Sequence, residues 1–243
     1  MTYFLRWPPV RLTIFENPRC TGMDYADART QMVERQIVRR GVRDPAVLNA
    51  MREVPREAFV AADFQDAAYE DRALPIAEDQ SISQPYIVAV MLEAAGLRPP
   101  DRVLEIGAGS GYAAAIIARI VRRVFAIERQ AVLAEAAGER LRALGSRNVE
   151  MKTGDGSQGW PERAPFDAII VSAGAPRIPA ALKDQLAEGG RLVIPIGTTD
   201  EQRLLRLVRK GSRFQESDLG AVHFVRLIGT GGWEDEQRTD GKI

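Results

Sequence analysis

Cysteine and histidine are almost missing from this chain of 243 residues, which contains one of each, Cys20 and His223. A lone cysteine cannot form a disulfide within the chain, and this pair is too small a set for a zinc site of Cys and His ligands. No Gly-x-Ser-x-Gly motif is present, which disfavours a hydrolase built on a serine and a histidine. The composition therefore predicts a protein without a bound metal, whose chemistry does not depend on a histidine base.

Net charge is also lacking, since 33 Lys and Arg residues balance 33 Asp and Glu residues. A broad phosphate-binding face needs clustered basic residues, so this balance disfavours a nucleic-acid partner. No apolar run approaches the roughly 18 residues that cross a membrane, and Pro8 and Pro9 split the apolar opening segment, which no small-residue cleavage site follows. We therefore expect a cytoplasmic protein with no membrane partner.

The first hundred residues have a helical character. Met23 begins a far more helix-like segment than the residues before it, so residues 1–22 are predicted to be a disordered or extraneous extension. The predicted helices run over 24–40, from the Asp44 cap through Met51, and from Pro85 to the stop at Gly96. We expect one domain over 23–233, with a helical cap and active-site segment at 23–100, a cofactor-binding sheet at 101–233, and a mobile tail at 234–243.

From residue 101 onward, apolar strands alternate with helices. The last two predicted strands, RLLRLVRK and AVHFVRLIG, follow each other without an intervening helix, which indicates an antiparallel pair. The pattern predicts an α/β fold with a doubly wound, mostly parallel sheet, an antiparallel C-terminal edge and an N-terminal helical cap. The strands are expected at 102–106, 123–128, 148–153, 166–174, 189–197, 203–210 and 221–229, and the later helices at 130–144 and 179–187.

A glycine turn, EIGAGSG, follows the first of these strands. A dinucleotide fingerprint would need a further glycine at position 112, where this chain has Tyr112. An acid two residues before the first glycine suits the ammonium group of S-adenosylmethionine, whereas it would repel a pyrophosphate. The turn therefore predicts S-adenosylmethionine as cofactor and disfavours a nicotinamide oxidoreductase. The residues expected to contact the cofactor here are Glu105, Gly107, Ala108, Gly109 and Gly111.

Two more polar groups stand at the ends of the next strands. Glu128 closes the second strand, where a carboxylate can accept hydrogen bonds from both ribose hydroxyls, and Asp155-Gly156 follows the third, where an adenine edge would lie. Each signal alone has a structural explanation, as a connector, a solvated strand end or a β-turn. Ligands of such sheets bind at the carboxyl ends of the strands, so the three signals together predict a cofactor site.

The stretch QSISQPY (80–86) gathers two hydroxyls and two amides directly before a helix. If Pro85 is the first helical residue, the cap position falls on Gln84, which is a poor cap, and Ser83 comes one position too early. Helix capping therefore explains the stretch only imperfectly, and a catalytic role for Ser83 remains open beside it.

Several longer stretches together resemble the protein-L-isoaspartate (D-aspartate) O-methyltransferases. They are ALPIAEDQSISQPYIVAVM, VLEIGAGSGY, GDGSQGW, APFDAIIVSAGAPRIPAAL and EGGRLVIPIG, within a similarity that runs from about residue 25 to 233. The resemblance implies a class I, Rossmann-like methyltransferase, expected to be a monomer. Its implied reaction uses S-adenosylmethionine to methylate the α-carboxyl of L-isoaspartyl residues in damaged proteins and peptides, which initiates repair. It also implies Ser83 as the active-site serine, Tyr86 as a cofactor contact, and substrate contacts at Ile82, Ser83, Ala175, Val222 and His223.

The chain departs from the family pattern at the expected peptide groove. Ala77-Glu78-Asp79 replaces a glycine-containing approach, Ser81 stands where threonine is usual, and VHFVRL replaces VRFVPL, so His223 and Arg226 are unusual on the expected edge strand. Two other functions stay open at this point. One is a methyltransferase for a small molecule or RNA, although the neutral charge counts against RNA. The other is a non-catalytic cofactor-binding module that recognises damaged proteins.

Overall fold

The computed structural model describes residues 24–235. The predicted extension at 1–22 lies outside this range, and so does the predicted tail apart from Glu234 and Asp235. The Asp235 carboxylate pairs with Arg129, with 2.8 Å between oxygen and nitrogen. Within residues 24–235 no helix combines the length and the apolar character needed to cross a membrane.

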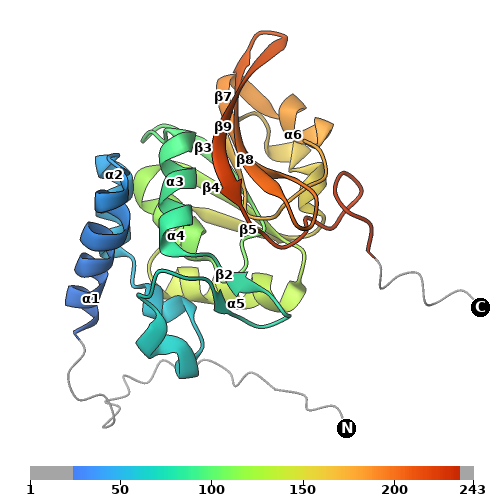
Figure 1. Ribbon diagram of the computed structural model, residues 1–243. Helices are drawn as coiled ribbons and strands as arrows, with labels where there is room; N and C mark the ends of the chain where they lie inside the picture. The colour runs from blue at the N-terminus through green and yellow to red at the C-terminus, as the bar shows by residue number, and fades with distance from the viewer. Residues whose placement is uncertain (1–23, 236–243) are drawn as a thin grey trace, which may run out of the picture.

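Seven strands form one sheet in the order β5-β4-β3-β6-β7-β8-β9 (Figure 1). The strands β5, β4, β3, β6 and β7 are parallel, and β7, β8 and β9 are antiparallel to one another. The predicted doubly wound sheet with an antiparallel edge is therefore confirmed. The strands are β3 (Arg102–Ile106), β4 (Arg123–Glu128), β5 (Val149–Thr153), β6 (Phe166–Val171), β7 (Leu186–Gly197), β8 (Gln202–Lys210) and β9 (Arg213–Val222).

Alternate residues of the central strands serve the two faces of this sheet. On β6, Ala168 and Ile170 belong to one apolar core, whereas Ile169 and Val171 belong to the other. Both faces are covered, which is why these strands are almost wholly apolar. Glu105 is a buried acid in the middle of this apolar pattern on β3.

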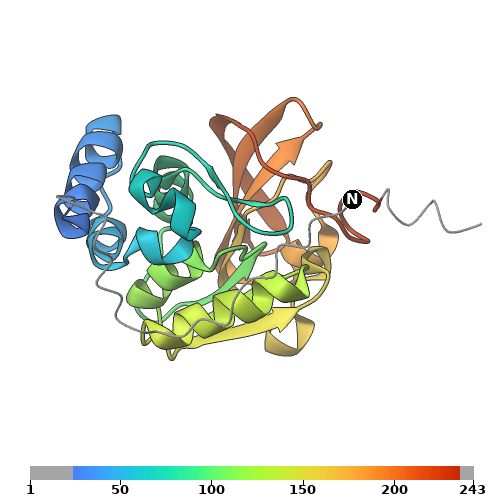
Figure 2. The same ribbon diagram turned by 90° about the horizontal axis from the view of Figure 1, so that it is seen from below.

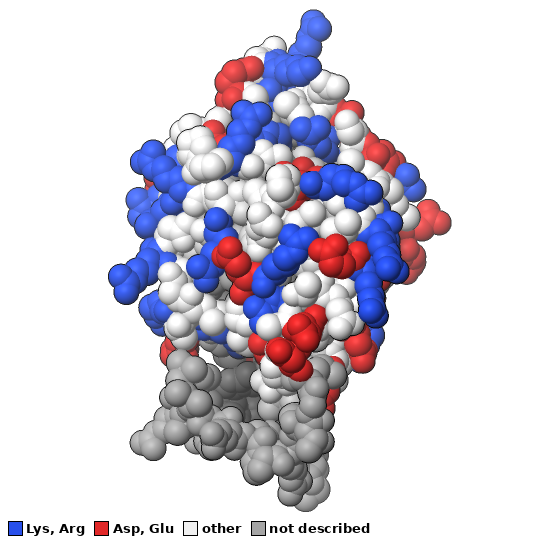
Figure 3. All heavy atoms as spheres, turned by 90° about the vertical axis from the view of Figure 1, so that its left-hand side faces the viewer, with Lys and Arg blue, Asp and Glu red and all other residues white. Residues whose placement is uncertain are grey.

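Helices cover both faces of the sheet, most of them on one side (Figure 2). The core on that side contains residues of α2, α3, α4 and α5, and α1 and α2 form an outer layer at the left of Figure 1. The core on the other side includes Leu182 of α6. The helices are α1 (Tyr25–Met32), α2 (Pro45–Glu53), α3 (Pro85–Ala95), α4 (Tyr112–Ile120), α5 (Ala131–Ala143) and α6 (Ala180–Asp184). On the outer side of α1 and α2, basic and acidic side chains are interspersed (Figure 3).

Local signals in the sequence set the ends of the N-terminal helices. After α1 the chain continues through a π-helical turn, Val33–Ile37, and a 3-10 turn that ends at Gly41 with φ +103°. The Asp44 carboxylate caps α2 by accepting from the backbone N–H groups of Ala46 and Val47. Helix α3 begins at Pro85, and Gln84 provides no side-chain cap. The predicted boundaries at residues 41, 44 and 85 are confirmed.

Two predicted elements are wrong. The antiparallel partner of β8 is the polar stretch RFQESDLGAV (β9) and not AVHFVRLIG, because the apolar Phe224 and Leu227 are buried beside Gly174 outside the sheet. The helix predicted at 179–187 ends at Asp184, because Leu186 already pairs with Phe166 as the first residue of β7.

Candidate active site

The carboxyl ends of the four neighbouring strands β5, β4, β3 and β6 meet at one edge of the sheet. The glycine turn 107–111 follows β3, Glu128 is the last residue of β4, and Ser172 follows β6. A short antiparallel hairpin, β1 (Leu74–Pro75) with β2 (Ser81–Ile82), approaches the same edge. Its Ile76 side chain lies beside Gly109, where an added Cβ would come within 3.6 Å of the Ile76 Cδ1.

Glu128 is bonded to the glycine turn. Its Oε2 accepts a hydrogen bond from the Gly109 N–H at 2.8 Å, and its Oε1 accepts one from the Gln130 N–H at 2.9 Å. The turn itself needs glycine, since Gly107, Gly109 and Gly111 have φ values of +77°, +53° and +88°. Each carboxylate oxygen keeps further lone pairs for a ligand. The carboxylate at the end of β4 is thus held in place by the backbone and can still accept hydrogen bonds from a ligand.

Glu105 is the buried acid of the site. Its side chain is almost fully enclosed, and its Oε2 has no hydrogen-bond partner among the residues the structure describes. Burial, and to a lesser degree the charge of Glu128, raises the pKa of Glu105 to about 8. An unpaired buried carboxyl of this kind indicates a polar partner that the protein itself does not provide.

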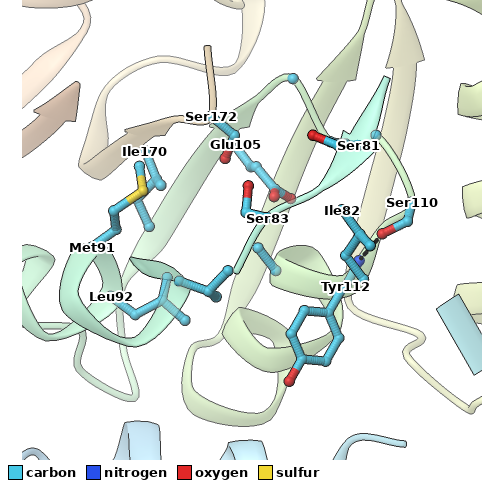
Figure 4. A pocket seen from close by; sticks show the side chains of 15 residues that line it. Ser81, Ile82, Ser83, Met91, Leu92, Glu105, Ser110, Tyr112, Ile170 and Ser172 are labelled. Carbon is cyan, nitrogen blue, oxygen red and sulfur yellow. Dashed lines mark hydrogen bonds between the residues drawn. The ribbon is translucent and has the colours of Figure 1, made fainter. Parts of the chain in front are cut away.

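Two small cavities and a groove meet around this carboxyl. The cavity beside Glu105, which we call the Glu105 cavity, is also lined by Ser83, Tyr112 and Met91. In Figure 4 the Ser83 side chain points toward the Glu105 carboxyl, and Ser172 lies next to the same side chain. The adjoining Glu128 cavity is lined by Glu128, Gly156, Arg226 and Ile228 among others. Four residues line both cavities, namely Ser81, Gly107, Gly109 and Ser172.

The groove is larger and reaches the surface. It has a volume of about 680 Å³ and is lined by residues of α3, of the hairpin and of the segment after β9, including Tyr86, Val222 and His223. It shares Ser81, Ser83 and Ser172 with the Glu105 cavity. These three serines therefore stand where an enclosed space opens into one wide enough for a peptide.

Most of the predicted site residues come together here, with some differences in detail. Ala108 and Ile82 line the Glu105 cavity, and Gly156 lines the Glu128 cavity, where an added Cβ would lie 2.3 Å from the Ile106 Cγ2. Tyr86, predicted to contact the cofactor, instead faces the groove, with the Arg40 Cζ 3.4 Å from its ring centroid. Gly111 packs on α5, since an added Cβ would lie 3.2 Å from the Ala137 Cβ.

Two predicted residues have other surroundings than expected. Ala175 is fully buried and bridges to Ile196, outside the lining of the three spaces. The Asp155 carboxylate is occupied by the protein itself, accepting from the backbone and hydroxyl of Ser157 and of Thr230 at 2.6–3.0 Å. Burial alone would raise the pKa of Asp155, but these hydrogen bonds hold it below its ordinary value. Asp155 thereby ties down residues 228–233, which we call the C-terminal segment.

Ser81 and Ser172 line both cavities and the groove, although the sequence assigned neither of them a role in the site. Ser172 directly follows the apolar strand β6, so the strand-end rule applied to Glu128 would have found it. Ser81 belongs to the stretch QSISQPY but pairs in the hairpin with Pro75. The hairpin turn also accounts for one departure, because Glu78 and Asp79 adopt φ of +58° and +53°, values that favour glycine.

Comparisons with known proteins agree with this geometry. Residues 27–232 match the family model described as protein-L-isoaspartate(D-aspartate) O-methyltransferase. A protein-L-isoaspartate O-methyltransferase of Methylorubrum extorquens is 61% identical over 84% of this chain and 90% of its own length. A solved structure of the same name superposes with a TM-score of 0.76 at 30% identity, covering 85% of this chain and 67% of that one.

A further structure, of a Plasmodium falciparum protein named for the same activity and crystallised with S-adenosyl-L-homocysteine, has a TM-score of 0.72. It is 28% identical and the match covers 82% of this chain and 98% of that one. The fold is thus that of the class I methyltransferases. With a family model that spans most of its length and a relative above 60% identity, this chain belongs to the family of protein-L-isoaspartate (D-aspartate) O-methyltransferases.

Proposed function

We propose that this enzyme transfers a methyl group from S-adenosylmethionine to the α-carboxyl of L-isoaspartyl residues in damaged proteins and peptides, which initiates their repair. One observation carries the proposal: Ser83 lines both the small Glu105 cavity, beside the glycine turn, and the larger groove. The cavity beside the glycine turn suits the cofactor, and the larger groove suits a peptide. Ser83 is then positioned between the two reactants.

The cofactor roles follow from the groups at the strand ends. The Glu105 carboxyl, whose Oε2 lacks a hydrogen-bond partner within residues 24–235, fits the ammonium group of the methionine part of the cofactor. Glu128, already fixed by Gly109, fits the ribose hydroxyls. Gly107, Ala108 and Gly109 form the wall of the Glu105 cavity, and Gly156, whose missing side chain leaves room for Ile106, forms part of the wall of the Glu128 cavity. Asp155 acts here through the C-terminal segment, whose residue Ile228 lines the Glu128 cavity.

The chemistry needs few catalytic groups from the protein. The α-carboxyl of an isoaspartyl residue has an ordinary pKa of about 3.5, so at neutral pH it is already a nucleophilic carboxylate. S-adenosylmethionine supplies, when bound, the electrophilic methyl group. The Ser83 hydroxyl donates a hydrogen bond to the carboxylate and holds it in line, and alignment of this kind is worth on the order of 7–11 kcal/mol. The absence of a histidine base is consistent with this reaction.

The substrate contacts, location and assembly state are part of the proposal. Ile82, Val222 and His223 contact the peptide, and the last two are supported by their place in the groove. We propose further that the enzyme acts as a monomer in the cytoplasm, where its cofactor and its protein substrates are found, and without a nucleic-acid partner.

The direct test is transfer of labelled methyl from S-adenosylmethionine to an isoaspartyl peptide, with the normal aspartyl peptide of the same sequence as control. We expect label only in the isoaspartyl peptide, and base treatment should release it because a methyl ester is formed. Equal labelling of both peptides would point to another carboxyl substrate. S-adenosylhomocysteine binding without any transfer would favour a non-catalytic binding module instead.

A further inference from the structure

The irregular segment VPREAFV (54–60) places a charged side chain in the protein interior. Arg56 has an exposed fraction of 0%. The part of the chain that the structure describes offers it no carboxylate within ion-pair distance, and burial lowers the pKa of its guanidinium. An unpaired buried charge is costly to a fold, so its retention calls for a specific role.

Arg56 donates hydrogen bonds to backbone carbonyls of two segments that are distant from it in the sequence. Its Nε–H donates to the Ala68 oxygen at 2.7 Å, and its Nη2–H donates to the Ser83 oxygen at 2.9 Å. The rigid, planar fork of a guanidinium suits two fixed acceptors, whereas a lysine ammonium is a single point charge. Arg56 therefore ties the backbone of Ser83 to the protein interior, although Arg56 itself does not line the cavity.

The same guanidinium also touches the cofactor side of the site. Its Cζ lies 4.8 Å from the ring centroid of Tyr112, the first residue of α4 and the neighbour of Gly111. Phe59, from the same segment, packs edge-on against that ring with 5.5 Å between centroids. Tyr112 lines the Glu105 cavity, while Arg56 lines none of the three spaces around Ser83. One buried side chain thus contacts both the serine segment and the helix that follows the glycine turn.

We propose that Arg56 is a positioning residue for methyl transfer, which holds the Ser83 backbone at a fixed place relative to the first turn of α4. With the carbonyl of Ser83 bound from behind, its hydroxyl stays directed into the space between the cofactor and the peptide. The inference rests on the proposed function, since it acts through the catalytic role given to Ser83.

A double-mutant comparison tests this role. Arg56→Lys keeps the charge but loses the fork, and we expect it to lower kcat for the isoaspartyl peptide about tenfold, as for one hydrogen bond to a charged group. KM for S-adenosylmethionine should stay within twofold. In a Ser83→Ala background the same change should cost little more, because the hydroxyl that it positions is gone. An equal fold loss in both backgrounds would overturn the proposal.

Arg191→Lys is the matched control. Arg191 is also buried and donates to the Ala95, Gly96 and Asp167 carbonyls, but it lies away from the site. We expect Arg191→Lys to lower the unfolding temperature while leaving kcat unchanged. If it lowers kcat as much as Arg56→Lys does, the effect at Arg56 is general destabilisation and the proposal fails.

Hydrogen exchange gives a readout that does not depend on activity. In Arg56→Lys, amide exchange over residues 81–84 should accelerate at least tenfold, with the strand 102–106 unchanged. Should the lysine variant not fold, Arg56→Gln, which keeps a planar donor, replaces it in the same comparison. A wild-type enzyme that failed to methylate the peptide would refute the proposed function. The exchange result would still decide on Arg56, and unchanged exchange over 81–84 would overturn its positioning role.

Discussion

Two buried carboxyl groups near each other determine how this site behaves at the scale of single residues. Glu128 is held as an acceptor by two backbone N–H groups, whereas Glu105 has one oxygen without a partner among the described residues. Burial, and to a lesser degree the neighbouring Glu128 charge, raises the pKa of Glu105 to about 8. An arriving cation therefore favours the ionised form of Glu105.

Cofactor affinity should for this reason depend on pH. Below the Glu105 pKa of about 8 the free protein carries a proton there, and an arriving ammonium group must displace it. Raising the pH from about 6 to 7.5 reduces this competition, so S-adenosylhomocysteine should bind roughly twentyfold more tightly at the higher pH. Calorimetric titration at both values measures it. Glu105→Gln should bind more weakly and show little pH dependence, and a flat profile for the wild-type protein would contradict the role of Glu105.

Ser83→Ala should slow the reaction without weakening the cofactor. Losing one hydrogen bond to the charged carboxylate costs about 1.5–3 kcal/mol, which corresponds to a roughly ten- to 150-fold lower kcat. Affinity for S-adenosylhomocysteine should stay unchanged in a titration. Ser146→Ala serves as control, because Ser146, which is more buried than the half-buried Ser83, follows α5 away from the cavities. Parallel losses of kcat and affinity in Ser83→Ala would show that the serine is only a structural residue.

At the scale of elements, the C-terminal segment (228–233) is the part of the cofactor cavity most remote in sequence from the glycine turn. It is fastened to β5 by Asp155, by a hydrogen bond of 2.8 Å from the Gly231 N–H to the Ser157 hydroxyl, and by one of 2.6 Å between Gln158 and Thr230. Ile228 from this segment lines the cavity. The hydrogen bonds that Asp155 accepts after β5 thus help to hold the apolar Ile228 in the lining of the Glu128 cavity.

Asp155→Asn should make the C-terminal segment more mobile. The amide can accept fewer of the four hydrogen bonds, so we expect faster hydrogen exchange over residues 228–233 and a several-fold weaker affinity for S-adenosylhomocysteine. Asp218→Asn is the matched control. Asp218 lies on β9 outside the cavities and accepts hydrogen bonds from the Gly220 N–H and from the side chain of Arg203 on β8. An unchanged exchange rate in Asp155→Asn would mean that the segment is held by its apolar contacts alone.

The helices and strands differ in how well the sequence predicts them. Helix ends at Gly41, Asp44 and Pro85 were predictable because they depend on local backbone chemistry. The strand β9 was missed because an edge strand that is polar on both faces has no alternating pattern. Arg56 lies in an aperiodic segment, and its partners at residues 68 and 83 are brought to it only by the fold.

Site prediction shows the same division between local and long-range information. Glu105, Glu128, Gly107 and Gly109 could be predicted to lie together because the carboxyl ends of parallel strands meet by topology, and the structure places them in the walls of the two cavities. Tyr86 was placed toward the cofactor, yet the direction in which α3 leaves the hairpin turns its ring into the groove beside Arg40. Which wall of a site a helix residue faces depends on packing between elements, and the sequence period does not reveal it.

For the molecule as a whole, the buried Glu105 carboxyl opposes folding once it ionises. Its pKa is about 8 in the folded protein against an ordinary 4.5, so between these values the folded state binds a proton that the unfolded state has lost. The free energy of unfolding therefore falls as pH rises through this range, by up to about 1.4 kcal/mol per pH unit. The ligand-free protein should thus be less stable at pH 8 than at pH 6.

Urea unfolding without cofactor measures this change. We expect the wild-type protein to lose about 2–3 kcal/mol between pH 6 and pH 8, and Glu105→Gln to lose much less over the same range. Saturating S-adenosylhomocysteine should restore much of the loss at pH 8, since its ammonium group compensates the buried charge. Equal pH profiles for the two proteins would mean that Glu105 is not protonated in the folded state at pH 6.

Every role assigned above requires that cofactor and substrate meet at Ser83, at the end of the strands where the two cavities open into the groove. A crystal structure with S-adenosylhomocysteine and an isoaspartyl peptide tests this most directly. The account predicts the nucleoside against Glu128, the amino group at Glu105, and the isoaspartyl α-carboxylate within hydrogen-bond distance of the Ser83 hydroxyl. A peptide bound outside the groove, or a carboxylate remote from Ser83, would contradict it.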